Sequence, residues 1–240
     1  MNVLVDATTP QAQPVTHKQA TRIQRSVLTG LEKRTLLWLA RRMPAAINSD
    51  HLTVLAFVAM IGVGFSYWLS NVTPIGLALA TLLLAVNWFG DSLDGTLARV
   101  RDHQRPRYGY YVDHVVDIVG TVFLFGGLAL SGIMSAPIAA ALLIAYFLVS
   151  LEVYLATNSL GTFQMSFFGV GPTELRILLA LGNVALFVRG SETVLGSSFT
   201  LFDVGGIAGA IGMVATFTYS AVRNTRTLYR AEPLPGRKKQ

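Results

Sequence analysis

The sequence predicts an all-α, polytopic membrane protein with six transmembrane helices that follow a cytosolic amphipathic helix. Three observations support this fold class. Hydrophobic residues make up 52% of the 240-residue chain, and charged residues make up only 13%. The apolar residues gather into runs near the roughly 20 residues that a helix needs to cross a bilayer. Lysine and arginine collect at alternate ends of these runs.

Six apolar segments are candidate membrane spans within a transmembrane domain that we expect over residues 49–225. The basic residues outside these segments fall on one side of the membrane, with Arg189 as the one exception. By the positive-inside rule that side is cytoplasmic, so both termini are expected in the cytoplasm. The candidate spans are residues 52–69, 75–98, 110–130, 137–156, 173–188 and 204–222.

The ends of the chain are polar. Residues 1–18 are predicted to be a disordered tail, and residues 226–240 a basic cytosolic tail. Residues 19–48 mix apolar side chains with arginine and lysine, which indicates an amphipathic segment too charged to span. This segment either lies in the headgroup region of an anionic leaflet or packs on the bundle as a soluble helix.

Composition excludes some functions. The chain has no cysteine, so it has no disulfide bonds. Its formal net charge of +6 could indicate nucleic-acid binding. The basic residues lie at the ends of apolar runs, however, where membrane topology accounts for them, so we expect no nucleic-acid partner.

Four carboxylates lie at the flanks of the second and third candidate spans. Asp91 and Asp94 are spaced i, i+3, and Asp113 and Asp117 are spaced i, i+4, so each pair lies on one helix face. Acids in or near hydrocarbon are costly and usually mark a functional site in a bundle interior. A cluster of oxygen ligands without cysteine predicts a hard cation (Mg2+, Mn2+ or Ca2+) rather than zinc.

Small residues accompany these acids. Gly95, Ala98 and Gly109 leave room for a ligand to approach the backbone. Metal ions held by the acids could bind a pyrophosphate, and Arg99 could add charge to its phosphate oxygens. A spare carboxylate could accept the proton of a nucleophile. The pattern therefore predicts displacement at phosphorus.

The same stretch resembles the signature of the CDP-alcohol phosphotransferase family, also called CDP-alcohol phosphatidyltransferases. The resemblance implies a six-helix bundle, usually a homodimer, over roughly residues 20–225. It implies transfer of a substituted phosphate from CDP-diacylglycerol or another CDP-alcohol to an acceptor hydroxyl, with release of CMP, in phospholipid biosynthesis. All fixed positions are present, in the order Asp91-x2-Asp94-Gly95-x2-Ala98-Arg99-x9-Gly109-x3-Asp113-x3-Asp117.

The resemblance also implies roles for these residues. Asp91, Asp94, Asp113 and Asp117 would bind Mg2+ or Mn2+, two ions in all, and Asp117 would serve as general base. The cavity would open to the cytoplasm and the inner leaflet. The remaining motif residues would admit the CDP moiety and support the site, and they are Gly95, Ala98, Arg99 and Gly109.

One segment departs from the family pattern. Many members open the first span with Pro-Asn-x-x-Thr, whereas here the segment is Ser49-Asp50-His51-Leu52-Thr53. Asp50 in place of asparagine adds an acid near the expected nucleotide site. The role of this segment is therefore left open.

Acceptor residues are suggested by three charges in the later spans. Glu152 lies deep in the fourth span, and Glu174 and Arg176 open the fifth. The two acids would suit a cationic acceptor or head group, whereas Arg176 would suit a phosphate-bearing acceptor such as glycerol phosphate or inositol phosphate. Alternatively, Glu174 is a first-turn residue favoured by the helix dipole and paired with an arginine.

Two other classes of function compete with the transferase. Intramembrane acids also mark ion pathways, so a cation transporter or channel is one alternative. A catalytically silent membrane scaffold is another. All four acids gather at one membrane face, and a cation path does not require the small residues or Arg99 of the motif, which favours the transferase.

Overall fold

A computed structural model describes residues 21–23, 29–164, 172–190, 199–232 and 234. The predicted N-terminal tail lies outside the described residues, as do residues 233 and 235–240 of the predicted C-terminal tail. The described chain is almost entirely helical, with two three-residue strands that pair in parallel. The elements are β1 (Thr21–Ile23), α1 (Thr29–Arg42), α2 (Ser49–Leu69), α3 (Ile75–Val100), α4 (Pro106–Leu130), α5 (Ala136–Leu160), β2 (Thr162–Gln164), α6 (Pro172–Arg189) and α7 (Leu201–Ala231).

Within the described residues, five helices are long and apolar enough to cross a membrane, namely α2, α3, α4, α5 and α7. They make this chain a multi-pass integral membrane protein. The sequence predicted six spans. The difference is α6, whose 18 residues include Glu174, Arg176 and Arg189. These charges lower its hydropathy, so the sixth crossing stays a prediction.

The helices extend beyond the predicted spans because hydropathy locates the apolar part of a helix and not its capped ends. Helix α2 begins at Ser49, where the side chain of Asn48 accepts a hydrogen bond from the His51 amide at 3.0 Å. The His51 ring in turn accepts a hydrogen bond from the Asn48 amide, which completes a capping box. At the other end of the chain, α7 continues past the predicted span to Ala231, so the start of the predicted basic tail is helical.

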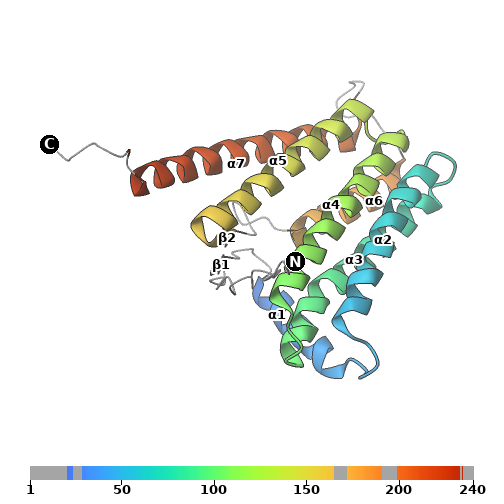
Figure 1. The fold of residues 1–240 in the computed structure, drawn as a ribbon. Helices are drawn as coiled ribbons and strands as arrows, with labels where there is room; N and C mark the ends of the chain where they lie inside the picture. The colour runs from blue at the N-terminus through green and yellow to red at the C-terminus, as the bar shows by residue number, and fades with distance from the viewer. Residues whose placement is uncertain (1–20, 24–28, 165–171, 191–198, 233, 235–240) are drawn as a thin grey trace, which may run out of the picture.

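Helix α2 lies against both α3 and α4 (Figure 1). Glycines let the backbones approach closely at these contacts. A Cβ atom on Gly127 of α4 would lie 2.2 Å from the carbonyl oxygen of Gly64 in α2. A Cβ atom on Gly90 of α3 would lie 2.6 Å from the carbonyl oxygen of Leu52. Small residues at such contacts are the usual means of packing helices in a membrane, where burial from water contributes little.

Helix α1 packs on α3 near the end of the bundle that carries the acids. Leu36 and Ala40 of α1 are buried against Leu52, Leu93 and Leu97. The other face of α1 is exposed. A helix is therefore present in the predicted amphipathic segment, and it packs on the bundle.

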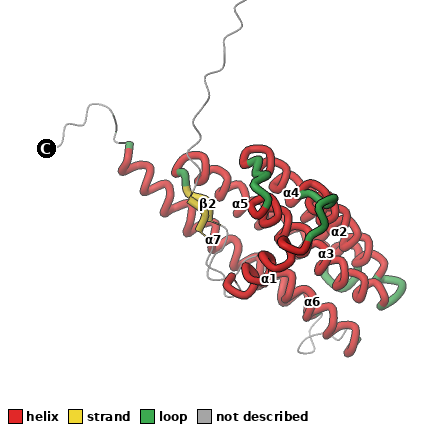
Figure 2. Tube along the Cα trace, turned by 90° about the horizontal axis from the view of Figure 1, so that it is seen from below, coloured by secondary structure: helices red, strands yellow, loops and turns green. Residues whose placement is uncertain are grey.

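Helices α5 and α7 lie side by side (Figures 1 and 2), with α5 packed on α4 and Phe202 of α7 packed against Tyr67 of α2. The start of α7 is fixed by Asp203, which accepts hydrogen bonds from the amide and hydroxyl of Ser135 at 2.7 and 3.0 Å. Asp203 also caps its own helix together with Thr200. The α5–α7 pair is thus anchored at the end opposite the predicted site.

We predict that Gly127→Ala destabilises the protein because the added methyl group would collide with the α2 backbone. Overpacking of this kind costs about 1–3 kcal/mol. Thermal unfolding in detergent micelles should show a lower midpoint. Gly126→Ala is the matched control, since a Cβ atom there meets nothing within 4 Å. Equal midpoints for the two variants would contradict the proposed close contact.

Candidate functional site

Three of the four predicted metal-ligating acids come together. Asp91 of α3 and Asp113 and Asp117 of α4 each place one carboxylate oxygen within 4.8 Å of the other two. Helices α3 and α4 are joined by a short loop, and the i, i+4 spacing of Asp113 and Asp117 turns both toward α3. We call these three residues the acid trio.

The fourth acid, Asp94, lines the same pocket but lies outside the acid trio. Its carboxylate accepts a hydrogen bond from the Thr53 hydroxyl at 2.6 Å and one from the Gly95 amide at 2.5 Å. The pocket is bounded by α2, α3 and α4. Its lining residues are Thr53, Ala56, Met60, Asn87, Asp91, Asp94, Asp113, Val116 and Asp117.

The chemistry of the acid trio suits a divalent cation. Oxygen ligands lie about 2.0–2.6 Å from Mg2+ or Ca2+, so ligands on opposite sides of one ion are about 4–5 Å apart. The separation within the acid trio falls in this range. The donors are all carboxylate oxygens, which favour Mg2+, Mn2+ or Ca2+ over zinc. The residues present therefore fit a metal site.

Arg176 of α6 reaches this site from 85 residues along the chain. Its Nη2 donates to Asp91 at 2.5 Å, and its Nε donates to the side chain of Asn87 at 2.8 Å. Asn87 in turn donates to the carbonyl oxygen of Ala56 at 3.0 Å. The side chains of Arg176 and Asp91 are only 14% and 22% exposed. Arg176 thus links α6 to α3 at the acid trio, and through Asn87 to α2.

Asn87 is not among the site residues predicted from the sequence. A signal was available, because Asn87 is a polar residue in an apolar run and lies one helical turn before Asp91. That spacing places both side chains on one face of α3. An amide at such a position, buried among helices, needs partners for both its donor and its acceptor. Arg176 and Ala56 supply them.

The small residues of the motif leave open surface beside the acids. A Cβ atom on Gly109 would meet nothing within 4 Å. On Gly95 it would meet only the guanidinium of Arg99, at 3.4 Å. Arg99 is exposed and donates to the Thr96 hydroxyl at 3.0 Å, while Ala98 is half-buried. Tight helix packing therefore does not explain glycine at either position.

The segment that departs from the family pattern contacts the motif. Thr53 donates to the Asp94 carboxylate, and the Ser49 hydroxyl donates to the Asp94 carbonyl oxygen at 2.9 Å. Asp50 turns the other way and forms an exposed ion pair with Arg105. The hydrogen bond from Arg105 to Asp50 raises the pKa of that guanidinium. Asp50 therefore contacts the loop between α3 and α4.

The other two predicted acceptor residues lie elsewhere. Glu152 of α5 is 8% exposed, and its carboxylate accepts a hydrogen bond from Asn224 of α7 at 2.7 Å. It does not line the pocket of the acids. Glu174 lies in the first turn of α6, where the helix dipole favours an acid.

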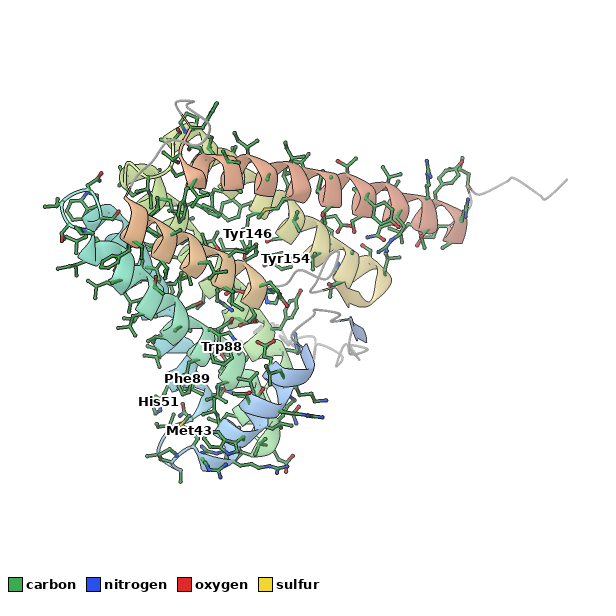
Figure 3. The ribbon with its side chains drawn as sticks, turned by 180° about the vertical axis from the view of Figure 1, so that it is seen from behind. Met43, His51, Trp88, Phe89, Tyr146 and Tyr154 are labelled. Atoms are coloured by element: carbon green, nitrogen blue, oxygen red, sulfur yellow. The ribbon has the colours of Figure 1, made fainter. Side chains whose placement is uncertain are left out.

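His114, the residue after Asp113, has surroundings that packing explains. Its ring lies between Tyr110 and Tyr154, with ring centroids 4.1 and 4.8 Å away. Tyr154 belongs to α5 and lies on the same side of that helix as Tyr146, facing the interior of the bundle (Figure 3). The tilted contact with Tyr110 and the edge-on contact with Tyr154 connect α4 to α5 beside Asp113.

Comparison with known proteins agrees with the geometry. A sequence model of the CDP-alcohol phosphatidyltransferase family matches residues 47–218, which include the pocket and Arg176. A curated relative, an archaetidylinositol phosphate synthase from Pyrococcus horikoshii, is 29% identical over 104 residues. That alignment covers 43% of this chain and 52% of the relative, so the chain spans about half the length of the relative it matches. The protein belongs to the CDP-alcohol phosphatidyltransferase family.

Proposed function

We propose that this protein is a metal-dependent transferase of phospholipid biosynthesis. It moves a phosphatidyl or phospho-alcohol group from a CDP-linked donor to an acceptor hydroxyl and releases CMP. The observation that carries the proposal is the convergence of Asp91, Asp113 and Asp117 in a chain of this family. The donor is CDP-diacylglycerol or another CDP-alcohol, and membrane lipids surround the site.

The metal would be Mg2+ or Mn2+. The acid trio would hold one ion, and Asp94 with Asp117 would contribute to a second. When bound, the ions supply charge that neutralises the pyrophosphate and stabilises the leaving group. Asp94 already has one oxygen held by Thr53 and the other by its neighbouring amide, so it is oriented without an ion.

The reaction is displacement at the donor phosphorus that carries the alcohol. The acceptor oxygen forms a bond to this phosphorus, and the bond from phosphorus to the oxygen of CMP breaks. Asp117 would accept the proton of the acceptor hydroxyl as general base. Gly95, Ala98 and Gly109 would let the CDP moiety approach the backbone, and Arg99 would contribute positive charge beside it.

Membrane placement follows from charge. The acids lie near the loop that carries Arg101 and Arg105, so we place the site and both termini on the cytoplasmic side. Helix α6 would make the sixth crossing, because 18 residues at about 1.5 Å each extend about 27 Å. Helix α1 exposes Leu31 and Trp38, which would lie in the headgroup region. The family resemblance implies a homodimer, which we retain as part of the proposal.

Arg176 favours a phosphate-bearing acceptor. Its guanidinium lies at the acid trio, where it could contact an anionic group on the incoming alcohol. The relative from Pyrococcus is named as an archaetidylinositol phosphate synthase, which agrees with such an acceptor. A cationic acceptor bound by Glu174 and Glu152 is the second candidate. Glu152 is engaged with Asn224, and this contact makes the second candidate weaker.

We predict that Asp91→Ala and Asp117→Ala each reduce CMP release by more than about 100-fold, because each removes a metal ligand or the base. CMP release would be measured on purified protein in lipid nanodiscs with Mg2+ or Mn2+. Donors would be CDP-diacylglycerol, CDP-choline and CDP-ethanolamine. Acceptors would be glycerol phosphate, serine, inositol, inositol phosphate and diacylglycerol.

Mn2+ binding, followed by electron paramagnetic resonance, should weaken in the same two variants. Asp102→Asn is the control, since Asp102 is an exposed acid of the neighbouring loop. Full activity in either alanine variant would remove the mechanism. If the wild-type protein releases no CMP with any donor and acceptor of the panel and binds no CMP, the transporter or the scaffold is favoured.

Gly109→Ala separates ligand access from folding. Alanine is a better helix former than glycine by about 1 kcal/mol, and the position has open space, so stability should hold or rise. The added methyl group should nevertheless raise the KM for the CDP donor, by about tenfold if a backbone approach of about 1 Å is lost. Gly126→Ala in the same helix has equally open surroundings and should leave KM unchanged. Unchanged donor KM in Gly109→Ala would rule out backbone contact there.

Acceptor choice is tested by a pair of variants. Arg176→Gln should lower kcat/KM for a phosphate-bearing acceptor by about tenfold or more, since a charged hydrogen bond contributes about 1.5–3 kcal/mol. Glu152→Gln keeps an oxygen for Asn224 and should leave acceptor preference unchanged. Mn2+ affinity would be measured alongside to detect damage to the acid trio. If Glu152→Gln instead changes the preference and Arg176→Gln does not, the cationic acceptor is correct.

A further inference from the structure

Glu32 of α1 lies outside the family motif and outside the pocket, yet it contacts two helices of the site. One oxygen of its carboxylate accepts three hydrogen bonds. The donors are the indole nitrogen of Trp88 at 3.1 Å, the hydroxyl of Ser92 at 3.3 Å and the hydroxyl of Thr173 at 2.8 Å. Trp88 and Ser92 belong to α3, and Thr173 belongs to α6. In Figure 3, Trp88 lies where α1, α3 and the start of α6 meet.

The position of Glu32 on α1 is well defined. Leu36 and Ala40 follow it at i+4 and i+8, so the three residues share the face that packs on α3. Glu32 also lies in the first turn of α1, where the helix dipole favours a carboxylate. Hydrogen bonds to a charged acceptor are stronger than those between neutral groups. Glu32 is therefore a fixed acceptor for its three donors.

The partners of Glu32 neighbour the residues of the site. On α3, Trp88 and Ser92 directly follow Asn87 and Asp91, the two residues that Arg176 contacts. On α6, Thr173 precedes Arg176 by three residues, so both project from adjacent turns of one surface. Helix α6 is thus attached to α3 twice at the same level, directly through Arg176 and indirectly through Glu32.

We infer that Glu32 is a positioning residue that fixes the first turn of α6 against α3 and thereby sets the place of Arg176 beside the acid trio. The kinetic effect expected of Glu32 rests on the proposed function. The structural effect rests on its hydrogen bonds alone. Glu32 thus adds a second polar link between the start of α6 and α3 to the one that Arg176 itself makes. Without Glu32, an acceptor that draws on Arg176 would meet a less well-ordered guanidinium.

The structural consequence can be measured without any assay of activity. The chain has no cysteine, so spin labels can be placed on introduced cysteines alone. Arg34→Cys on the exposed face of α1 and Leu178→Cys on the exposed face of α6 report the separation of these helices. The distance distribution, from double electron–electron resonance in nanodiscs, should be narrow in the parent protein and broader in Glu32→Ala. Glu32→Gln keeps an oxygen acceptor and should restore the narrow distribution.

The kinetic consequence is a rise in acceptor KM of about tenfold in Glu32→Ala, with donor KM changed by less than about twofold. Thr173→Val removes one donor and should act in the same direction. The double variant should be no worse than Glu32→Ala alone, because residues that act through one contact are not additive. Glu232→Ala, at an exposed acid beyond α7, is the control and should change none of these quantities.

The outcomes distinguish this inference from the proposed function. An unchanged distance distribution in both Glu32→Ala and Thr173→Val, or fully additive kinetic effects, would overturn the positioning role. If Glu32→Ala does not fold, the distance distribution of Thr173→Val alone tests the positioning role. A broadened distribution in a protein whose wild type neither releases nor binds CMP would instead reject the proposed function and keep the positioning role. Metal-dependent CMP release together with an unchanged distance distribution would support the proposed function and reject the positioning role.

Discussion

Three carboxylates of one sign lie within 4.8 Å of one another at the ends of two membrane helices. The surrounding structure has to compensate the repulsion between them, because charges near hydrocarbon are poorly screened. Arg176 compensates part of this repulsion by donating a hydrogen bond to Asp91 from a distant helix. The neighbouring Asp94 is held by Thr53 and by a backbone amide. A divalent cation would compensate the remaining repulsion.

The helices that hold this cluster have backbones in close contact. Gly64 and Gly127 bring α2 and α4 together, and Gly90 brings α3 to α2. In these places glycine is required by packing. Gly109 has the opposite surroundings, with open space where a side chain would be. The same residue type thus serves two purposes, and the distance to the nearest backbone distinguishes them.

The amphipathic segment contacts two helices of the site. Its apolar residues Leu36 and Ala40 are buried on α3, and its one acid accepts hydrogen bonds from α3 and α6. Of the two placements expected for this segment, the membrane surface and the bundle, the structure shows contact with the bundle. Helix α1 therefore carries both exposed basic residues and a carboxylate that contacts the helices of the site.

The features that depend on local spacing could be predicted from the amino-acid sequence alone. The i, i+4 relation of Asp113 and Asp117, the apolar runs and the glycine-containing motif all follow from helical periodicity, and they sufficed to identify the family and the acids. The contacts between residues far apart in the chain became evident from the three-dimensional fold. The pairing of Arg176 with Asp91, of Glu152 with Asn224 and of Glu32 with Thr173 depends on how whole helices pack. No periodicity encodes such contacts, because each is fixed by side-chain packing between helices and not by the spacing of residues within one.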